Sequence, residues 1–299
     1  MLLLAAIIWG VSFVTQKLGG DYLGPFTFNS FRFFIGAAGV AIALIILDRV
    51  GITHKPKNKE ERMTLIKAGV LCGLFLTLAT NLQQIGLTFE ISSGKAGFIT
   101  ALYIVIVPII GMFFKQKCPW NVWVAVAISV VGLYFMCCTE SLSLKVVDIL
   151  FIGSAFAYAF QITCIGRFGS RVDGLRLSCI EFIVAGAITF IPALIREIIP
   201  YEGGMSAWAA QFADRNVWIV LLYMGLLCCS VAYSLQIIGM RGLNPTVASL
   251  LMSFESAFAL VAGVIFLDQE ISLREGIGCL VTFAAICLAQ FDFKKKKNV

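Results

Sequence analysis

A single carboxylate lies in an otherwise apolar stretch near the end of the chain. It is Glu255, in SLLMSFESAFALVAGVIF at residues 249–266. Asn244 and Pro245 before it favour a helix start, because asparagine caps a helix N-terminus and proline suits the first helical position. Eleven residues at about 1.5 Å each then carry Glu255 roughly 16 Å along that helix. A carboxylate there can neutralise an amino group or carry a proton. The structural alternative is a protonated glutamate hydrogen-bonded to a neighbouring helix.

Two further ionisable side chains, Arg32 and Glu181, lie inside apolar runs. A charge at the centre of a membrane costs at least about 2.5 kcal/mol, so a function is the first hypothesis. We expect both to act in gating or coupling, and binding of a substrate carboxylate is the other candidate role for Arg32. Arg32 is predicted about two turns below the outer surface, and Glu181 as far above the inner one. The two are therefore not expected to touch, and one small zwitterion is not expected to reach both Arg32 and Glu255. For Arg32 the alternative is snorkelling to the interface.

The elements that must position these residues are membrane helices. Of 299 residues, 60% are hydrophobic and 13% charged, against roughly 45–50% and about 25% in a soluble domain. A helix needs about 20 mostly apolar residues to span a bilayer. The sequence therefore predicts an all-α polytopic membrane protein with ten transmembrane helices, at residues 2–17, 27–47, 64–88, 94–114, 119–138, 147–166, 175–195, 217–238, 246–267 and 273–291.

Basic residues set the predicted orientation. With an even number of spans both termini lie on one side, and most of the 23 Lys and Arg residues lie in loops or tails on that side. Cytoplasmic loops carry an excess of Lys and Arg, so both termini are predicted in the cytoplasm and the protein in the cell membrane. The basic tail at 294–297 is expected to contact membrane lipid. A nucleic-acid partner is not expected, because no folded domain carries a basic face.

The chain resembles itself at an offset of 152 residues. This offset pairs Gln84 with Gln236 and Tyr103 with Glu255. Five helices per half would give the two halves opposite orientations, which predicts inverted five-helix repeats over residues 1–140 and 141–299, the second ending in the short basic tail. In secondary transporters of this architecture the substrate site lies near mid-membrane between the repeats.

Polar and aromatic side chains within the spans supply a candidate binding set. Interhelical hydrogen bonding is the alternative role for the glutamines, and packing is the alternative for the aromatic residues. The predicted substrate-binding residues are Glu255, Tyr103, Gln84, Gln236, Trp9 and Tyr158. A metal site is not expected, because the ten cysteines lie mostly in apolar runs and have no Cys-x-x-Cys spacing, as small apolar residues would.

Four segments carry a resemblance to a known family. They are AAIIWGVSFV (5–14), GPFTFNSFRFFIGA (24–37), LNPTVASLLMSFESAFALVAGVIFLDQEIS (243–272) and IGCLVTFAAICLAQ (277–290). Over essentially its whole length the chain resembles the EamA-type transporters of the drug/metabolite transporter superfamily. The family usually has proline after the glutamate of the ninth helix, where this chain has Ser256. The resemblance implies ten helices in two repeats that export or exchange small metabolites without a cofactor.

A carrier is favoured over an enzyme. The one histidine, His54, lies in a polar loop with no nucleophile nearby, and the isolated Glu255 lacks the acid–base partner that hydrolysis needs. The predicted function is secondary active export of amino acids or related amphipathic compounds by alternating access. The alternative is a proton-coupled carrier of cationic amines or drugs, with Glu255 binding both proton and substrate. Protons are the candidate coupling ion, and both a monomer and a homodimer stay open.

Overall fold

Helices make up nearly all of the computed structural model, which describes residues 1–89, 93–114, 118–137, 145–267 and 271–290. No strand occurs among these residues. The predicted basic tail at 294–297 lies outside them. The elements are α1 (Leu2–Tyr22), α2 (Pro25–Val50), α3 (Lys59–Leu87), α4 (Ser93–Ala101), α5 (Tyr103–Phe113), α6 (Trp120–Cys137), α7 (Asp148–Phe168), α8 (Gly174–Ala193), η1 (Leu194–Ile198), α9 (Gly204–Ala210), η2 (Gln211–Ala213), α10 (Arg215–Leu222), η3 (Tyr223–Tyr233), α11 (Ser234–Gly239), α12 (Pro245–Met252), α13 (Glu255–Leu267) and α14 (Leu273–Gln290).

Several of these segments have the length and composition of membrane spans. Within the described residues, seven helical segments are long and apolar enough to cross a bilayer: 25–50, 59–87, 96–113, 148–168, 174–198, 215–239 and 245–262. The helices at 2–12 and 120–136 are apolar but shorter. The chain is an all-α polytopic membrane protein. The number of ten crossings and the internal repeat stay predictions.

Polar side chains fix the starts of several helices. The side chain of Asn244 accepts a hydrogen bond from the Thr246 amide at 2.9 Å, and that of Asp173 accepts one from the Arg176 amide at 3.1 Å. Each bond satisfies an amide that the first turn of a helix leaves without a backbone partner. The predicted helix start at 244–245 is therefore present, and Pro245 occupies the first position of α12.

Two of the predicted spans are interrupted. The spans predicted at 94–114 and 246–267 are present as apolar helical segments, but α4 gives way to α5 at Leu102 and α12 gives way to α13 at Ser253 and Phe254. The physical reason is local: at both breaks the amides turn to the carbonyl three residues back, Leu102 to Ile99 at 3.2 Å and Phe254 to Leu251 at 3.4 Å. These tighter turns interrupt the regular α-helical hydrogen bonding.

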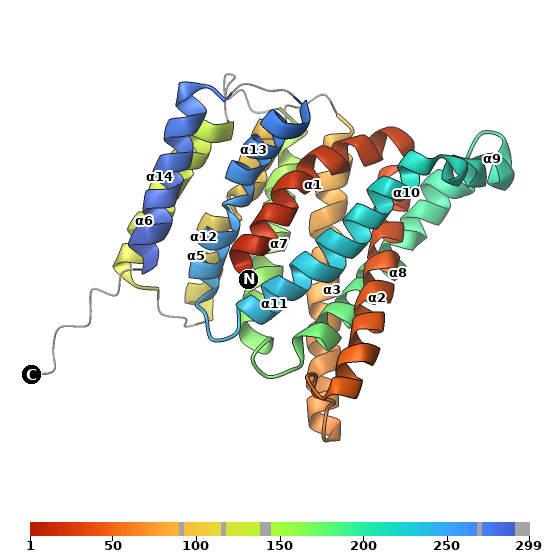
Figure 1. The fold of residues 1–299 in the computed structure, drawn as a ribbon, viewed down its shortest axis with the longest axis horizontal. Coiled ribbons are helices and arrows are strands. Elements are labelled where there is room, and N and C mark those ends of the chain that lie inside the picture. The colour runs from red at the N-terminus through yellow and green to blue at the C-terminus, as the bar shows by residue number, and fades with distance from the viewer. Residues whose placement is uncertain (90–92, 115–117, 138–144, 268–270, 291–299) are drawn as a thin grey trace, which may run out of the picture.

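The helices pack in a pattern that surrounds the two interrupted segments. Helix α2 packs against α8 and η3, and α3 packs against α7 and α8. Helix α1 packs against α13 and η3, while α5 packs against α7 and α12. Helices α6 and α14 lie side by side at one edge of the molecule, and α2, α3 and α8 form the opposite side (Figure 1). The interrupted segments thus lie between these two groups.

Two glycines allow close contacts of the helices that carry Arg32 and Glu181. A Cβ atom on Gly73 of α3 would lie 2.9 Å from the carbonyl oxygen of Glu181 on α8. A Cβ atom on Gly225 of η3 would lie 3.1 Å from the carbonyl oxygen of Arg32 on α2. Small residues of this kind let membrane helices approach closely. The helices that these glycines contact, α2 and α8, carry Arg32 and Glu181 into the interior.

Candidate functional site

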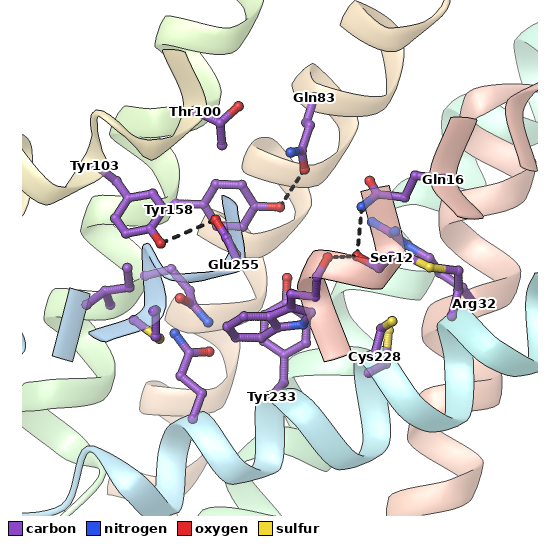
Figure 2. Close-up of a pocket in the computed structure, with 17 residues that line it drawn as sticks. Ser12, Gln16, Arg32, Gln83, Thr100, Tyr103, Tyr158, Cys228, Tyr233 and Glu255 are labelled. Carbon is purple, nitrogen blue, oxygen red and sulfur yellow. Dashed lines mark hydrogen bonds between the residues drawn. The ribbon is translucent and has the colours of Figure 1, made fainter. Parts of the chain in front are cut away.

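A cavity lies where α1, α2, α7, η3 and the two interrupted segments meet (Figure 2). Its volume is about 60 Å³, which holds roughly four water molecules. The lining combines two opposite charges with amide, hydroxyl, aromatic and thiol groups. The residues are Trp9, Ser12, Gln16, Arg32, Gln83, Thr100, Tyr103, Tyr158, Gln161, Ile162, Met224, Cys228, Cys229, Tyr233, Gln236, Met252 and Glu255.

The helix breaks place Glu255 and Tyr103 at this cavity. Glu255 is the first residue of α13, and Tyr103 is the first residue of α5. The phenol of Tyr103 donates a hydrogen bond to Oε1 of Glu255 at 3.4 Å. A carboxylate in the first turn of a helix is favoured by the positive end of the helix dipole. The amide of Ser256 donates to the Ser253 carbonyl at 3.2 Å, a bond that proline, with no amide hydrogen, would not make.

Arg32 brings a buried positive charge to the same cavity. Its exposure is only 4%, so the alternative of snorkelling to the interface is wrong. The guanidinium carbon lies 5.6 Å from the centre of the Phe28 ring and 5.2 Å from that of Phe33. Among the described residues, Arg32 forms no ion pair and its Nε has no hydrogen-bond partner. A buried charge needs a partner, and an anionic group of a ligand would supply one.

Aromatic and polar groups complete the lining. The phenol of Tyr158 donates to Oε1 of Gln83 at 2.9 Å, and the rings of Trp9 and Tyr233 meet edge to face at 4.9 Å between centres. Buried polar groups normally have hydrogen-bond partners. Several lining atoms have none among the described residues, which leaves them available to a polar ligand: Trp9 Nε1, Gln16 Oε1, Thr100 Oγ1, Gln161 Oε1 and Gln236 Oε1.

Six of the eight predicted site residues line the cavity, and two do not. Those present are Glu255, Tyr103, Trp9, Tyr158, Gln236 and Arg32. Gln84 lies outside the lining, and its side-chain amide donates to the backbone carbonyl of Gln16 at 3.3 Å. Glu181 is fully buried behind the cavity and accepts a hydrogen bond of 2.8 Å from Gln161, a lining residue.

Gln83 takes the place that the repeat had predicted for Gln84. The offset pairs Gln84 with Gln236, but η3 is π-helical over Tyr223–Tyr233 and α3 is α-helical. The wider winding of a π-helix turns the residues that follow it to a different face, so equal sequence offsets do not give equal orientations. Sequence reasoning also missed Ser12, Thr100 and the thiols of Cys228 and Cys229, for which no sequence signal was present beyond their place in a span.

Comparison with known proteins gives consistent matches over the whole chain. The model of the EamA-like transporter family matches residues 1–138 and again residues 145–291. An "Uncharacterized transporter" of Archaeoglobus fulgidus is 24% identical over 96% of this chain and 83% of its own length. "Uncharacterized transporter YoaV" of Bacillus subtilis is 22% identical over 97% of this chain and 96% of its own length.

A solved structure described as "Crystal structure of protein" superposes with a TM-score of 0.71 at 14% sequence identity. The match covers 95% of this chain and 97% of the other. At this identity the superposition supports the fold alone. The two family matches, one to each half, and the full-length relatives establish the family: the chain belongs to the EamA-like transporter family and is a membrane transporter.

Proposed function

We propose that the protein is a secondary active exporter of amino acids or related amphipathic compounds, with the substrate bound at mid-membrane in the cavity described above. The observation that carries the proposal is the lining of one cavity by two opposite charges, Glu255 and Arg32, with aromatic rings beside them. In this proposal the protein lies in the cell membrane with both termini in the cytoplasm, as its basic loops favour.

A zwitterion complements the charges of the lining. Its ammonium group would pair with Glu255 and its carboxylate with Arg32, whose charge is otherwise unbalanced among the described residues. The rings of Trp9 and Tyr233 offer apolar surface for a side chain. Charge-assisted bonds to both ends fix the orientation of the substrate and select for a compound that carries both an ammonium and a carboxylate group.

Alternating access would follow from ten helices in two inverted repeats, which the packing pattern supports. We replace each span by the equivalent span of the other half, five spans away along the chain. The principal helix contacts then become other contacts that the structure contains. The contact of α3 with α7 becomes that of η3 with α1, and the contact of α5 with α7 becomes that of α13 with α1. The contacts of α2 with α8 and of α6 with α14 map onto themselves. Such repeats move by rocking around a central site.

Glu181 is the candidate coupling group in this scheme. It is fully buried and is linked through Gln161 to the cavity lining. A proton on Glu181 would alter its hydrogen bond with Gln161, and so connect proton binding with the shape of the substrate site. Of the two roles expected for Arg32, gating and binding of a substrate carboxylate, this proposal gives it the second.

A second candidate function is the transport of cationic amines. The supporting observation is the ring system near Glu255, because Trp9, Tyr103, Tyr158 and Tyr233 all line the cavity. Aromatic faces attract ammonium groups, most strongly when desolvated. The buried charge of Arg32 opposes a second cation in the same cavity and therefore favours the amino acid.

The test is counterflow exchange in proteoliposomes. Vesicles loaded with unlabelled amino acids should take up labelled amino acid through the wild type, and uptake should fall strongly in Glu255→Gln. Glu202→Gln, in an exposed loop, is the matched control and should transport normally. Exchange of labelled polyamines or quaternary amines in place of amino acids would establish the second candidate. An imposed pH gradient tests protons as the coupling ion. Folded protein that exchanges neither class would overturn the proposal.

A further inference from the structure

A second hollow lies outside the transport cavity, between α2, α3 and α8 at one end of the molecule. Its volume is about 720 Å³. The residues that line it are Leu44, Pro56, Lys57, Asn58, Lys59, Arg62, Leu65, Ile66, Arg176, Cys179 and Ile180. We call it the basic groove. It shares no residue with the transport cavity, and the proposed function makes no use of it.

The basic groove combines positive charge with an apolar floor. Its four charged lining residues are all basic, and no acidic residue is among the lining. Lys57, Lys59 and Arg62 form no ion pair with a described residue. Of the carboxylates nearby, Asp48 accepts hydrogen bonds from Arg176, Glu61 accepts one from the Lys57 amide at 2.7 Å, and Glu60 is exposed and outside the lining. Three cations are thus free to meet an anion.

The place of the groove in the membrane agrees with an amphipathic ligand. Leu44 and Cys179 belong to helices α2 and α8, which are long and apolar enough to cross a bilayer, while Pro56 and Asn58 belong to the connecting segment outside them. The groove therefore runs from the end of the helices into the apolar zone. Its basic end lies on the side where positive loops predict the cytoplasm, and the cytoplasmic leaflet carries the anionic lipids.

We propose that the basic groove binds one anionic phospholipid. The phosphate would lie among Lys57, Lys59 and Arg62. One acyl chain would follow the apolar floor that Leu65 and Ile180 contribute. Basic pockets between membrane helices on the cytoplasmic side recognise headgroups in this way. Because the groove touches α2, α3 and α8, a bound lipid would join these three helices at one end.

Native mass spectrometry on purified full-length protein tests the proposal. The protein is titrated with phosphatidylglycerol and with phosphatidylcholine of the same acyl chains, as wild type and as the triple variant Lys57→Gln, Lys59→Gln, Arg62→Gln. The wild type should retain phosphatidylglycerol in preference, and the triple variant should bind it roughly 100-fold more weakly, since each basic residue near an anionic lipid contributes about fivefold. Equal retention by both proteins would overturn the proposal.

A control of equal charge separates a site from a general charge effect. The triple variant Lys145→Gln, Arg196→Gln, Arg215→Gln removes three exposed basic residues far from the groove and should bind phosphatidylglycerol as the wild type does. A loss as large as that of the groove variant would show nonspecific attraction and overturn the proposal. If the groove variant loses its helical circular dichroism, Arg62→Gln alone replaces it, with an expected loss of about fivefold.

A competition arm distinguishes a lipid from a free phosphate. Glycerol phosphate carries the same anionic group without acyl chains, so millimolar concentrations should leave bound phosphatidylglycerol in place, and affinity should increase with acyl-chain length. Displacement by glycerol phosphate at lipid-like concentrations would show that the groove binds soluble phosphate, and the lipid proposal would then be wrong.

Discussion

The pairing of Arg32 with a carboxylate and of Glu255 with an ammonium group can be tested by changing protein and ligand together. The ligands are a transported amino acid, its amide, which lacks the carboxylate, and its N-acetyl form, which lacks the ammonium. The protein variants are Arg32→Gln and Glu255→Gln. Calorimetric titration gives the dissociation constant for each combination. If a side chain and a ligand group bind each other, removing either one costs the same binding free energy, and removing both costs no more. If they do not interact, the two costs add.

The expected sizes follow from burial. A hydrogen bond to a charged group contributes about 1.5–3 kcal/mol, and 1.4 kcal/mol is tenfold in affinity. Arg32 is 4% exposed and has no competing ion pair among the described residues, so Arg32→Gln should weaken the amino acid by about 100-fold. Glu255 is half-buried and already accepts from Tyr103, so Glu255→Gln should weaken it by roughly tenfold.

The matched ligands decide the interpretation. Arg32→Gln should not weaken binding of the amide, and Glu255→Gln should not weaken binding of the N-acetyl form, because neither change removes a charge pair with that ligand. The other combinations of variant and ligand serve as controls. The N-acetyl form keeps its carboxylate, so Arg32→Gln should weaken its binding as much as it weakens binding of the amino acid. If either variant weakens all three ligands by the same factor, the residue acts through the protein structure and the assignment of the two charges is wrong.

Three further predictions concern packing, the lining and a helix start. Gly225→Ala should destabilise the protein by about 1–3 kcal/mol through overpacking, lowering the melting temperature, whereas Gly276→Ala, where an added Cβ meets nothing within 4 Å, should not lower it. Gln83→Leu should raise the dissociation constant of the transported amino acid several-fold in titration by freeing the Tyr158 phenol, while Gln84→Leu should leave that constant unchanged. Glu197→Ala removes an acceptor of two amides at the start of α2 and should lower stability by about 1 kcal/mol in thermal unfolding.

The sequence predicted the contact between Tyr103 and Glu255 but not the helix breaks that place these two residues together. The 152-residue offset places Tyr103 opposite Glu255, and the two meet by a hydrogen bond. The breaks before these residues were not predicted, because apolar runs without Gly or Pro at those points read as continuous helices. Proline in the family follows the glutamate, but here Ser256 keeps its amide bond to Ser253, so residue type alone does not mark the break at 253–254.

Arg32 and Glu255 line one cavity although the sequence places them at different depths. Counting residues from the helix start gives a distance along one helix, but it does not give the extent of a cavity. The lining follows α1 from Trp9 through Ser12 to Gln16, a length of about 10 Å at 1.5 Å per residue. A cavity this long reaches Arg32 on α2 as well as Glu255 on α13. Two charges at unequal depths can therefore face one elongated substrate.

A carboxylate that accepts two hydrogen bonds joins α2 and α8 at each end of their contact. Near the end of α2, Asp48 accepts bonds of 2.6 and 2.7 Å from Nη2 of Arg176 in the first turn of α8. Beyond the end of α8, Glu197 accepts bonds of 2.9 and 2.6 Å from the amides of Phe26 and Thr27 in the first turn of α2. Each carboxylate also meets the positive end of the partner helix dipole. The proposed inverted repeats pair α2 with α8, so these two contacts occupy equivalent ends of that pair. Because both ends are fastened, a rocking motion that opens the cavity would keep α2 and α8 together and separate them from α1 and the interrupted helices.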